Sequence, residues 1–191
     1  MTARILAFAG STRTNSYNKK LVNFAARAAE DAGAEVTLID LRDFALPLFD
    51  EDIEAAGTPI AATKLKQLFL SHNGLLIASP EYNSSISAVL KNAIDWVSRS
   101  APGEPMKAAF TGKVAAIMSA SPGGLGGLRG LVHVRSILEN ISVMVLPDQY
   151  ALGSAHSAFN DDGNLIEERA AKTVVDISQK LVHTISRLNA D

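Results

Sequence analysis

The sequence contains no cysteine, and this absence excludes several kinds of chemistry at once. Without a thiol the chain forms no disulfide, no thiolate nucleophile and no cysteine-ligated zinc or iron–sulfur site. The four histidines lack the close spacings that metal sites favour, so we predict no bound metal and expect these side chains on the surface or at helix ends. Any redox chemistry must therefore come from a bound organic cofactor.

Long apolar runs and blocks of charge are also missing. No segment approaches the ~20 apolar residues that a membrane span requires, and the first residues, Met-Thr-Ala-Arg-Ile-Leu, lack the regions of a signal peptide. The 18 basic and 20 acidic residues alternate along the chain and leave a net charge of −2. These features predict a cytoplasmic protein with neither a membrane partner nor a nucleic-acid partner.

What the chain does contain is an alternation of short apolar segments and segments with helical periodicity. Strands are expected at 3–9, 36–39, 74–80, 113–120 and 142–146, the last ended by Pro147. Helices are expected at about 18–32, around 65–69, and at 86–98, 126–140 and 165–188. Apolar strands that are each followed by an amphipathic helix predict a doubly wound α/β fold, a parallel sheet with helices on both faces. The length and the 47% apolar content predict a single domain spanning 1–191.

Ligands of such folds bind beyond the carboxyl ends of the strands, which directs attention to three loops. The first loop, 10–18, reads Gly-Ser-Thr-Arg-Thr-Asn-Ser-Tyr-Asn and ends where a helix begins. A helix amino terminus favours an anion, and Ser11, Ser16 and Asn18 add side-chain donors. Arg13 adds a fixed positive charge, so the loop suits a terminal phosphate such as that of FMN. An ordinary helix cap and turn would use the same residue types.

The second loop, 79–85, reads Ser-Pro-Glu-Tyr-Asn-Ser-Ser. A planar heterocycle needs an apolar or aromatic surface for its face and amide groups for its polar edge. Tyr82 offers the surface and the residues from Asn83 onward offer the polar groups. A helix-capping loop with an incidental tyrosine is an equally good interpretation of this segment alone.

The third loop, 119–129, has four glycines in five positions. Glycine lets the backbone approach a ligand closely or adopt positive φ angles, and four glycines are too many for a simple turn. The alternative is a mobile glycine loop that binds nothing.

Together the three loops resemble the NADPH-dependent FMN reductases, a family of the flavodoxin-like superfamily that includes bacterial quinone, chromate and azo-dye reductases. The matching segments are Gly10-Ser-Thr-Arg-x-x-Ser-x-Asn18, then Pro80-Glu-Tyr-Asn83 running into Leu90-Lys-Asn-Ala-Ile-Asp-Trp96, then Ser119-Ala-Ser-x-Gly-Gly124 with Arg129. Asp40-Leu-Arg-Asp43 is a weaker match. The resemblance spans nearly the whole chain and implies a five-stranded flavodoxin-like sheet of order 2-1-3-4-5, in a homodimer or homotetramer.

The resemblance also implies the roles of particular residues. Those that would hold the FMN phosphate are Ser11, Arg13, Ser16 and Asn18. Those that would line the isoalloxazine ring are Pro80, Glu81, Tyr82 and Asn83, with Ser121, Gly123 and Gly124 on its other side. One departure concerns Ser87-Ala88, which stands where many members have Pro-Gly at the start of the helix beside the flavin.

The helix expected at 86–98 has side chains open to two interpretations. Trp96 fits the core of an amphipathic helix, and contact with a partner subunit or the nicotinamide nucleotide is the alternative. Lys91 and Asp95 are four residues apart, a spacing that favours a pair on the helix surface.

The implied activity is that of an NAD(P)H-dependent FMN reductase or quinone reductase. A hydride passes from NADPH or NADH to FMN, and the electrons then pass to a small acceptor such as a quinone, an azo compound, chromate or free flavin. The sequence has no Ser-His-Asp motif, and we expect no side chain to act as an obligatory acid or base. The alternatives are a flavin-free binding or regulatory protein on the same fold, against which the phosphate loop argues, and a flavodoxin-type FMN electron carrier that serves a partner protein. Such carriers tend to be strongly acidic, and the net charge of −2 argues against one here.

Overall fold

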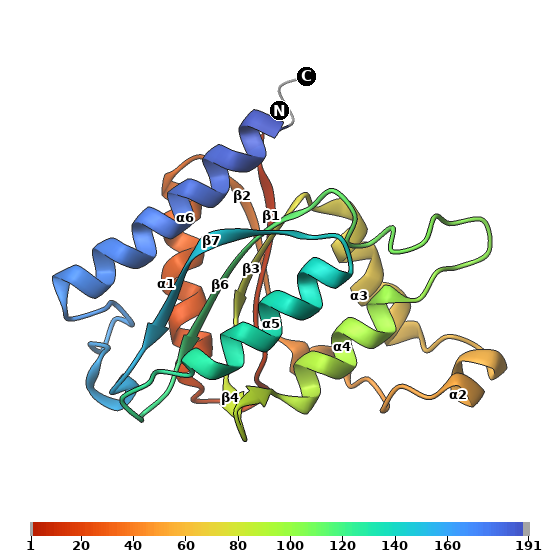
Figure 1. The fold of residues 1–191 in the computed structure, drawn as a ribbon, viewed down its shortest axis with the longest axis horizontal. Helices are drawn as coiled ribbons and strands as arrows, with labels where there is room; N and C mark the ends of the chain where they lie inside the picture. Colours follow the sequence, from red (N-terminus) through yellow and green to blue (C-terminus); the bar gives the residue numbers. More distant parts are fainter. Residues whose placement is uncertain (1, 189–191) are drawn as a thin grey trace.

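A computed structural model describes residues 2–188, which form a five-stranded parallel sheet between two layers of helices (Figure 1). The strands are β1 (Arg4–Ala9), β2 (Glu35–Ile39), β3 (Gly74–Ala78), β6 (Val114–Ala120) and β7 (Met144–Leu152). They pair in the order β2-β1-β3-β6-β7, which is the order 2-1-3-4-5 among the strands of this sheet. The predicted flavodoxin-like fold is therefore confirmed. Met1 and residues 189–191 of the predicted domain lie outside the described residues.

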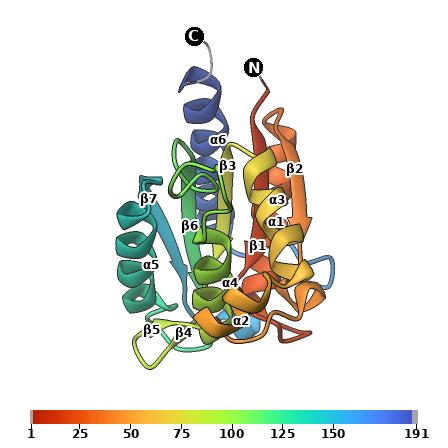
Figure 2. The ribbon, with the colours of Figure 1, turned by 90° about the vertical axis from the view of Figure 1, so that its right-hand side faces the viewer.

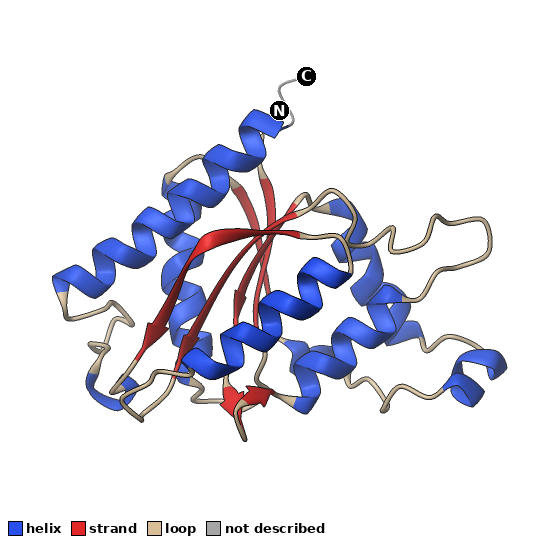
Figure 3. Ribbon diagram, viewed as in Figure 1, coloured by secondary structure: helices blue, strands red, loops and turns tan. Residues whose placement is uncertain are grey.

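Helices cover both faces of the sheet (Figures 2 and 3). One face packs against α1 (Tyr17–Asp31) and α6 (Glu168–Leu188). The other packs against α3 (Ile60–Ser71), α4 (Ala88–Ser98) and α5 (Leu128–Asn140). Among the described helices, none is long and apolar enough to span a membrane.

The residue patterns explain these layers. All residues of β3 and β6 are buried, because these strands lie inside the sheet with helices on both sides. On α6 the apolar residues Val174, Ile177 and Leu181 recur at helical spacing and all face the core. Burying each such side chain stabilises the fold by about 1.5–3 kcal/mol.

The last strand differs from the sequence prediction, which ends it at Pro147. In the structure β7 continues through Pro147 to Leu152, so that prediction is wrong. The pairing with β6 shifts register at this point: Ala115 pairs with Val145, and Ile117 pairs with Gln149. The irregularity accommodates a residue that has no amide donor, and β7 lies at the edge of the sheet, where proline is tolerated.

The stretch between β2 and α3, which shows no clear periodicity, contains two short helices, η1 (Leu41–Phe44) and α2 (Glu51–Ala56). An aspartate caps each: Asp40 accepts a hydrogen bond from the Arg42 amide (2.9 Å), and Asp50 caps α2 in the same way. Trp96 is 1% exposed and donates to the Pro47 carbonyl (2.8 Å), which holds this stretch against α4. The interpretation of Trp96 as a core residue is confirmed.

Candidate functional site

The three predicted loops meet at one edge of the sheet, beside the short strands β4 (Glu81–Tyr82) and β5 (Ser85–Ile86). The arrows of β1, β3 and β6 point toward this edge in Figure 1. Two cavities adjoin there. One, of about 390 Å³, lies between the first loop, Pro80–Tyr82 and Ala120–Pro122. The other, of about 460 Å³, lies between the second loop and the glycine loop, and both cavities are lined by Glu81 and Ser121.

All the residues predicted to bind the cofactor line these two cavities. The first cavity is lined by Ser11, Arg13, Ser16, Asn18, Pro80, Glu81, Tyr82 and Ser121. The second takes Asn83, Gly123 and Gly124 together with Glu81 and Ser121. The fold thus brings together residues that are more than 100 positions apart in the chain. Their binding roles stay predictions.

The amino terminus of α1 opens into the first cavity. Ser16 is the N-cap residue, but its side chain does not cap the helix, and the first turn contains no acidic residue. The amide groups and the positive partial charge of this helix end are therefore left for an anion. Nearby, Ser11 Oγ accepts a hydrogen bond from the Arg13 amide (3.3 Å), which shapes the loop around the cavity.

Asn18 has a structural contact that the sequence does not predict. Its Nδ2 donates to the Ala120 carbonyl (2.8 Å), and its Oδ1 accepts from the Ala120 amide (2.9 Å). This pair of bonds joins α1 to the end of β6 and fixes the spacing between the first and third loops. Nδ2 carries two protons, and one of them remains free to bind a phosphate oxygen. The predicted role of Asn18 in phosphate binding is therefore limited to this one N–H group.

Arg42 supports the first loop from outside and was not among the predicted residues. Its guanidinium donates to the Thr12 carbonyl and to Thr14 Oγ1, the latter at 3.1 Å. Asp40 lies beside it, paired with Lys19 at 2.5 Å. Burial would raise the pKa of Asp40, but hydrogen bonds from Lys19 and from the Arg42 amide hold it below its ordinary value. The weaker Asp40–Asp43 match was the one sequence signal for this contact.

The second loop is a β-hairpin, whereas the sequence predicts only a polar loop. Asn83 and Ser84 connect β4 to β5 with φ angles of 50° and 63°. Two successive positive φ angles define a type I′ turn, which follows the twist of the flanking strands. The hairpin presents the Tyr82 side chain, 58% exposed, at the rim of the first cavity.

Glu81 connects this hairpin to α5. Its carboxylate accepts hydrogen bonds from Arg129 Nε (2.8 Å) and from the Gly130 amide (3.1 Å), and the side chain is 7% exposed. Burial would raise the pKa of Glu81, but these hydrogen bonds outweigh it and lower the pKa below its ordinary value. Both carboxylate oxygens of Glu81 already accept hydrogen bonds from Arg129 and Gly130. The predicted contact of Glu81 with the flavin ring would therefore be made by its backbone.

The four glycines of the third loop divide into two pairs. Gly126 and Gly127 have φ angles of 62° and 90°, and a Cβ on Gly126 would lie 2.6 Å from the Ala151 carbonyl carbon. The fold itself requires this pair. Gly123 and Gly124 face open space instead: a Cβ on Gly124 would meet no atom within 4 Å. Both line the second cavity, so a flat ligand can lie directly against their backbone, as a flavin ring requires.

The sheet order and the cavities at its carboxyl edge define a protein of the flavodoxin-like class. Within that class, the NADPH-dependent FMN reductase family matches residues 3–157, and the chain belongs to this family. The resemblance found in the three loops is thereby confirmed.

Individual relatives agree with this assignment. The chain is 35% identical to an NAD(P)H-dependent FMN reductase of Pseudomonas aeruginosa, over 97% of this chain and 96% of that one. It is 36% identical to a quinone reductase of Pseudomonas putida, over 82% and 81% of the two chains. Among solved structures it is similar to FerB, a flavoenzyme NAD(P)H:acceptor oxidoreductase of Paracoccus denitrificans, with a TM-score of 0.83 and 26% identity over 97% and 98% of the chains.

Proposed function

We propose that this protein is an NAD(P)H-dependent FMN oxidoreductase that holds one FMN at the carboxyl edge of the sheet and reduces a small acceptor. The observation that carries the proposal is the pair of adjoining cavities, one beneath the free amino end of α1 and one against the backbone of Gly123 and Gly124. The first fits a phosphate and the second fits a flat ring. When bound, FMN would supply the redox chemistry, namely hydride acceptance from the nicotinamide and electron transfer to the acceptor.

The residues of the chain bind the FMN and orient its ring. Ser11, Ser16 and the amide groups at the start of α1 donate hydrogen bonds to the phosphate, and Arg13 balances its charge. Tyr82 covers part of the ring. The backbone of Gly123 and Gly124 would line the other side of the ring, and amide groups of this loop would donate to its polar edge. Glu81 acts through Arg129 and Gly130, because it holds the hairpin and α5 at a fixed separation.

Several relatives are named as quinone reductases, which supports a quinone as the acceptor of this chain. Besides the quinone reductase of Pseudomonas putida, the chain is 31% identical to a 2-hydroxy-1,4-benzoquinone reductase of a Burkholderia species, over 90% of each chain. An azo compound, chromate or free flavin would reach the same exposed site. The donor is NADPH or NADH, and the family description supports NADPH.

Further features belong to the same proposal. We expect residues 1–191 to act as one cytoplasmic domain, without nucleic-acid or membrane partners. We also expect a homodimer or homotetramer. Leu125, just before α5, and Leu128 and Val132, four residues apart on α5, are exposed apolar side chains, which supports contact between copies. Light scattering of the purified FMN-loaded protein measures the number of subunits.

The decisive experiment mixes FMN-loaded protein with NADPH, and separately with NADH, under anaerobic conditions while the flavin absorbance is followed. Rapid bleaching that a quinone reverses supports the reductase and ranks the two donors. FMN that binds but stays oxidised in both mixtures would instead identify the alternative, a flavodoxin-type electron carrier.

Two substitutions test the site itself. Arg13→Ala should weaken FMN binding, because it removes the positive charge beside the phosphate. Tyr82→Ala should alter the flavin spectrum and the turnover, because it uncovers the ring. A parent-like FMN affinity in the first variant, or a parent-like spectrum and rate in the second, would show that the substituted residue does not belong to the site.

A further inference from the structure

A third cavity, of about 710 Å³, adjoins the proposed flavin site, and the proposed function assigns no ligand to it. It shares Ser11, Arg13 and Tyr82 with the first cavity and Asn83 with the second. From there it extends along α4 and α5, which run side by side in both views (Figures 1 and 2). Its volume falls within the ~300–1,000 Å³ of small-molecule sites.

The chemistry of this cavity is apolar on one side and positive on the other. Ile86, Val89 and Ile137 supply the apolar wall. Arg13 and Lys91 supply positive charge, and none of the described residues that line the cavity is an aspartate or a glutamate. An elongated ligand with a flat apolar part and a phosphate group fits such a wall and such a charge.

We propose that this cavity binds the adenosine phosphate end of the nicotinamide dinucleotide, and that Lys91 pairs with one of its phosphates. The inference rests on the proposed function, in which the nicotinamide end reaches the flavin. Tyr82 and Asn83 line both this cavity and the proposed flavin site, so one dinucleotide can extend from the ring to Lys91.

Lys91 is the cation that belongs to this cavity and not to the proposed flavin site. The Arg13 guanidinium lies 5.2 Å from the centre of the Tyr17 ring and also lines the phosphate cavity. The ammonium of Lys91 contacts both carboxylate oxygens of Asp95, at 2.6 and 2.7 Å, one helical turn along α4. The Lys91 side chain is half exposed, and an exposed pair of this kind contributes little to stability. A phosphate can therefore replace Asp95 as its partner at small cost.

Calorimetric titration of the FMN-loaded protein with adenosine 2′,5′-bisphosphate and with ADP tests this site, because neither probe carries a nicotinamide or changes the flavin. Lys91→Gln should weaken binding on the order of tenfold, as expected for one lost charge-assisted contact. Weakening of the bisphosphate alone places Lys91 at the 2′-phosphate, and weakening of ADP as well places it at the diphosphate. The matched control is Lys172→Gln, because Lys172 forms the same kind of helix pair with Asp176 (2.5 Å) on α6.

A second variant blocks the cavity by volume. Ala88 is exposed at the first position of α4 and lines the cavity, so Ala88→Trp should fill it and abolish binding of both probes while FMN stays bound. The inference is overturned if the parent binds neither probe, or if both variants bind them as the parent does. Bleaching of the flavin by NADPH in the same preparations separates these failures from a failure of the proposed function, since that reaction tests only the latter.

Discussion

The hydroxyl group of Ser87 donates a hydrogen bond to the Gly10 carbonyl at 2.6 Å, across 77 positions of the chain. The same oxygen accepts from the Leu90 amide (3.2 Å) and so caps α4. Many members of the family have proline here, and proline makes neither bond. In this chain the residue at position 87 therefore ties the helix beside the flavin site directly to the loop that is proposed to hold the phosphate.

Ser87→Ala should lower the free energy of unfolding by about 1–2 kcal/mol, since it removes a helix cap together with a buried hydrogen bond. FMN affinity should fall as well, because the Gly10 carbonyl loses its tie to α4. Urea unfolding and flavin fluorescence titration measure the two effects. Ser136→Ala, at an exposed position on α5, is the control. Equal stability of the Ser87 variant and the control would contradict the argument.

The two glycine pairs predict opposite results for the same substitution. Gly126→Ala should destabilise the fold by at least 1 kcal/mol or so, because the new methyl group meets the Ala151 backbone at a positive φ angle. Gly124→Ala should leave the melting temperature unchanged but weaken FMN binding, because its methyl group enters the second cavity. Thermal melts without FMN, followed by FMN titration, separate the two. A stable Gly126 variant, or a Gly124 variant with parent-like affinity, would refute the division.

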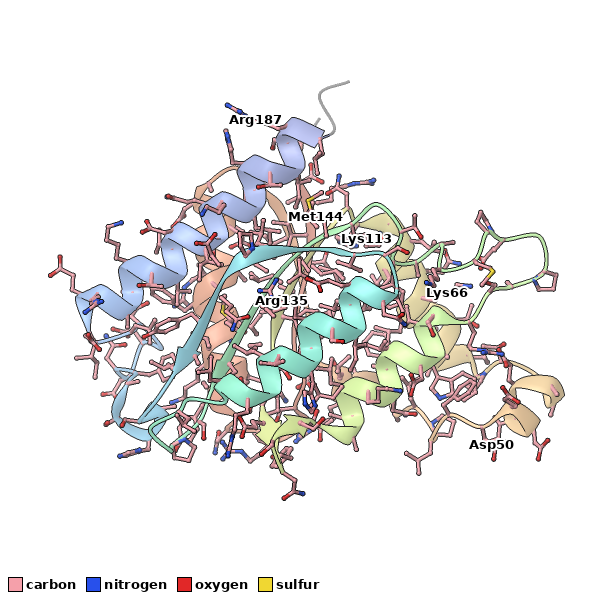
Figure 4. The ribbon with its side chains drawn as sticks, viewed as in Figure 1. Asp50, Lys66, Lys113, Arg135, Met144 and Arg187 are labelled. Atoms are coloured by element: carbon pink, nitrogen blue, oxygen red, sulfur yellow. The ribbon has the colours of Figure 1, made fainter. Side chains whose placement is uncertain are left out.

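Arg42→Ala should weaken FMN binding although Arg42 lines neither proposed flavin cavity. The hydrogen bonds of its guanidinium to Thr12 and Thr14 hold the first loop in place. Without them the free loop has more conformational entropy, which FMN binding must then remove. Titration of the apoprotein with FMN measures the change, with Arg187→Ala at the far end of α6 as the control (Figure 4). Identical affinities in the two variants would show that the loop is ordered without Arg42.

Glu81 should contribute to stability in a pH-dependent way. Its pKa lies below the ordinary 4.5 in the folded protein, so the contribution is present above pH 4.5 and is lost as pH falls through the folded value. Relative to Glu81→Gln, the parent should be more stable at pH 7 and should lose that advantage toward pH 3. Urea unfolding at both pH values measures this, with Glu139→Gln as the control on α5. A pH-independent difference between parent and Glu81→Gln would argue against the ionised bridge.

Lys113 should make stability depend on pH in the alkaline range. It is 6% exposed at the end of the sheet away from the proposed flavin site, where Figure 4 places it close to the start of β7. Burial, with repulsion from Arg4, lowers its pKa from 10.5 to about 8. Between these values the unfolded chain binds the extra proton, so stability due to this group rises with pH from 8 to 10.5.

The measurement for Lys113 compares the parent with Lys113→Met by urea unfolding at pH 7 and pH 10. The parent should gain stability relative to the variant at pH 10, because its ammonium no longer has to be buried charged. The hydrogen bond from Lys113 to the His72 carbonyl is lost at both pH values in the variant and cancels in the comparison. A difference that stays constant between the two pH values would contradict the lowered pKa.

Periodicity in the sequence was sufficient for the sheet and its helices, because strands such as β3 and β6 are apolar throughout. It failed at Pro147, since a local rule for proline cannot anticipate a register shift against β6. The loops revealed the position of the site but not its internal contacts. Gly126 and Gly124 are indistinguishable until Ala151 is placed beside one of them, and the partner of Glu81 lies 48 residues away.

The break in β7 has a consequence for how copies of this chain can associate. An incoming strand pairs with a sheet edge that offers evenly spaced donors and acceptors, and β7 lacks an amide at Pro147 and departs there from regular register. The outer margin of β7 is thus a poor template for continuing the sheet into a neighbour. At this edge association should use helical surfaces instead, and the irregular margin of β7 works against strand-by-strand aggregation there.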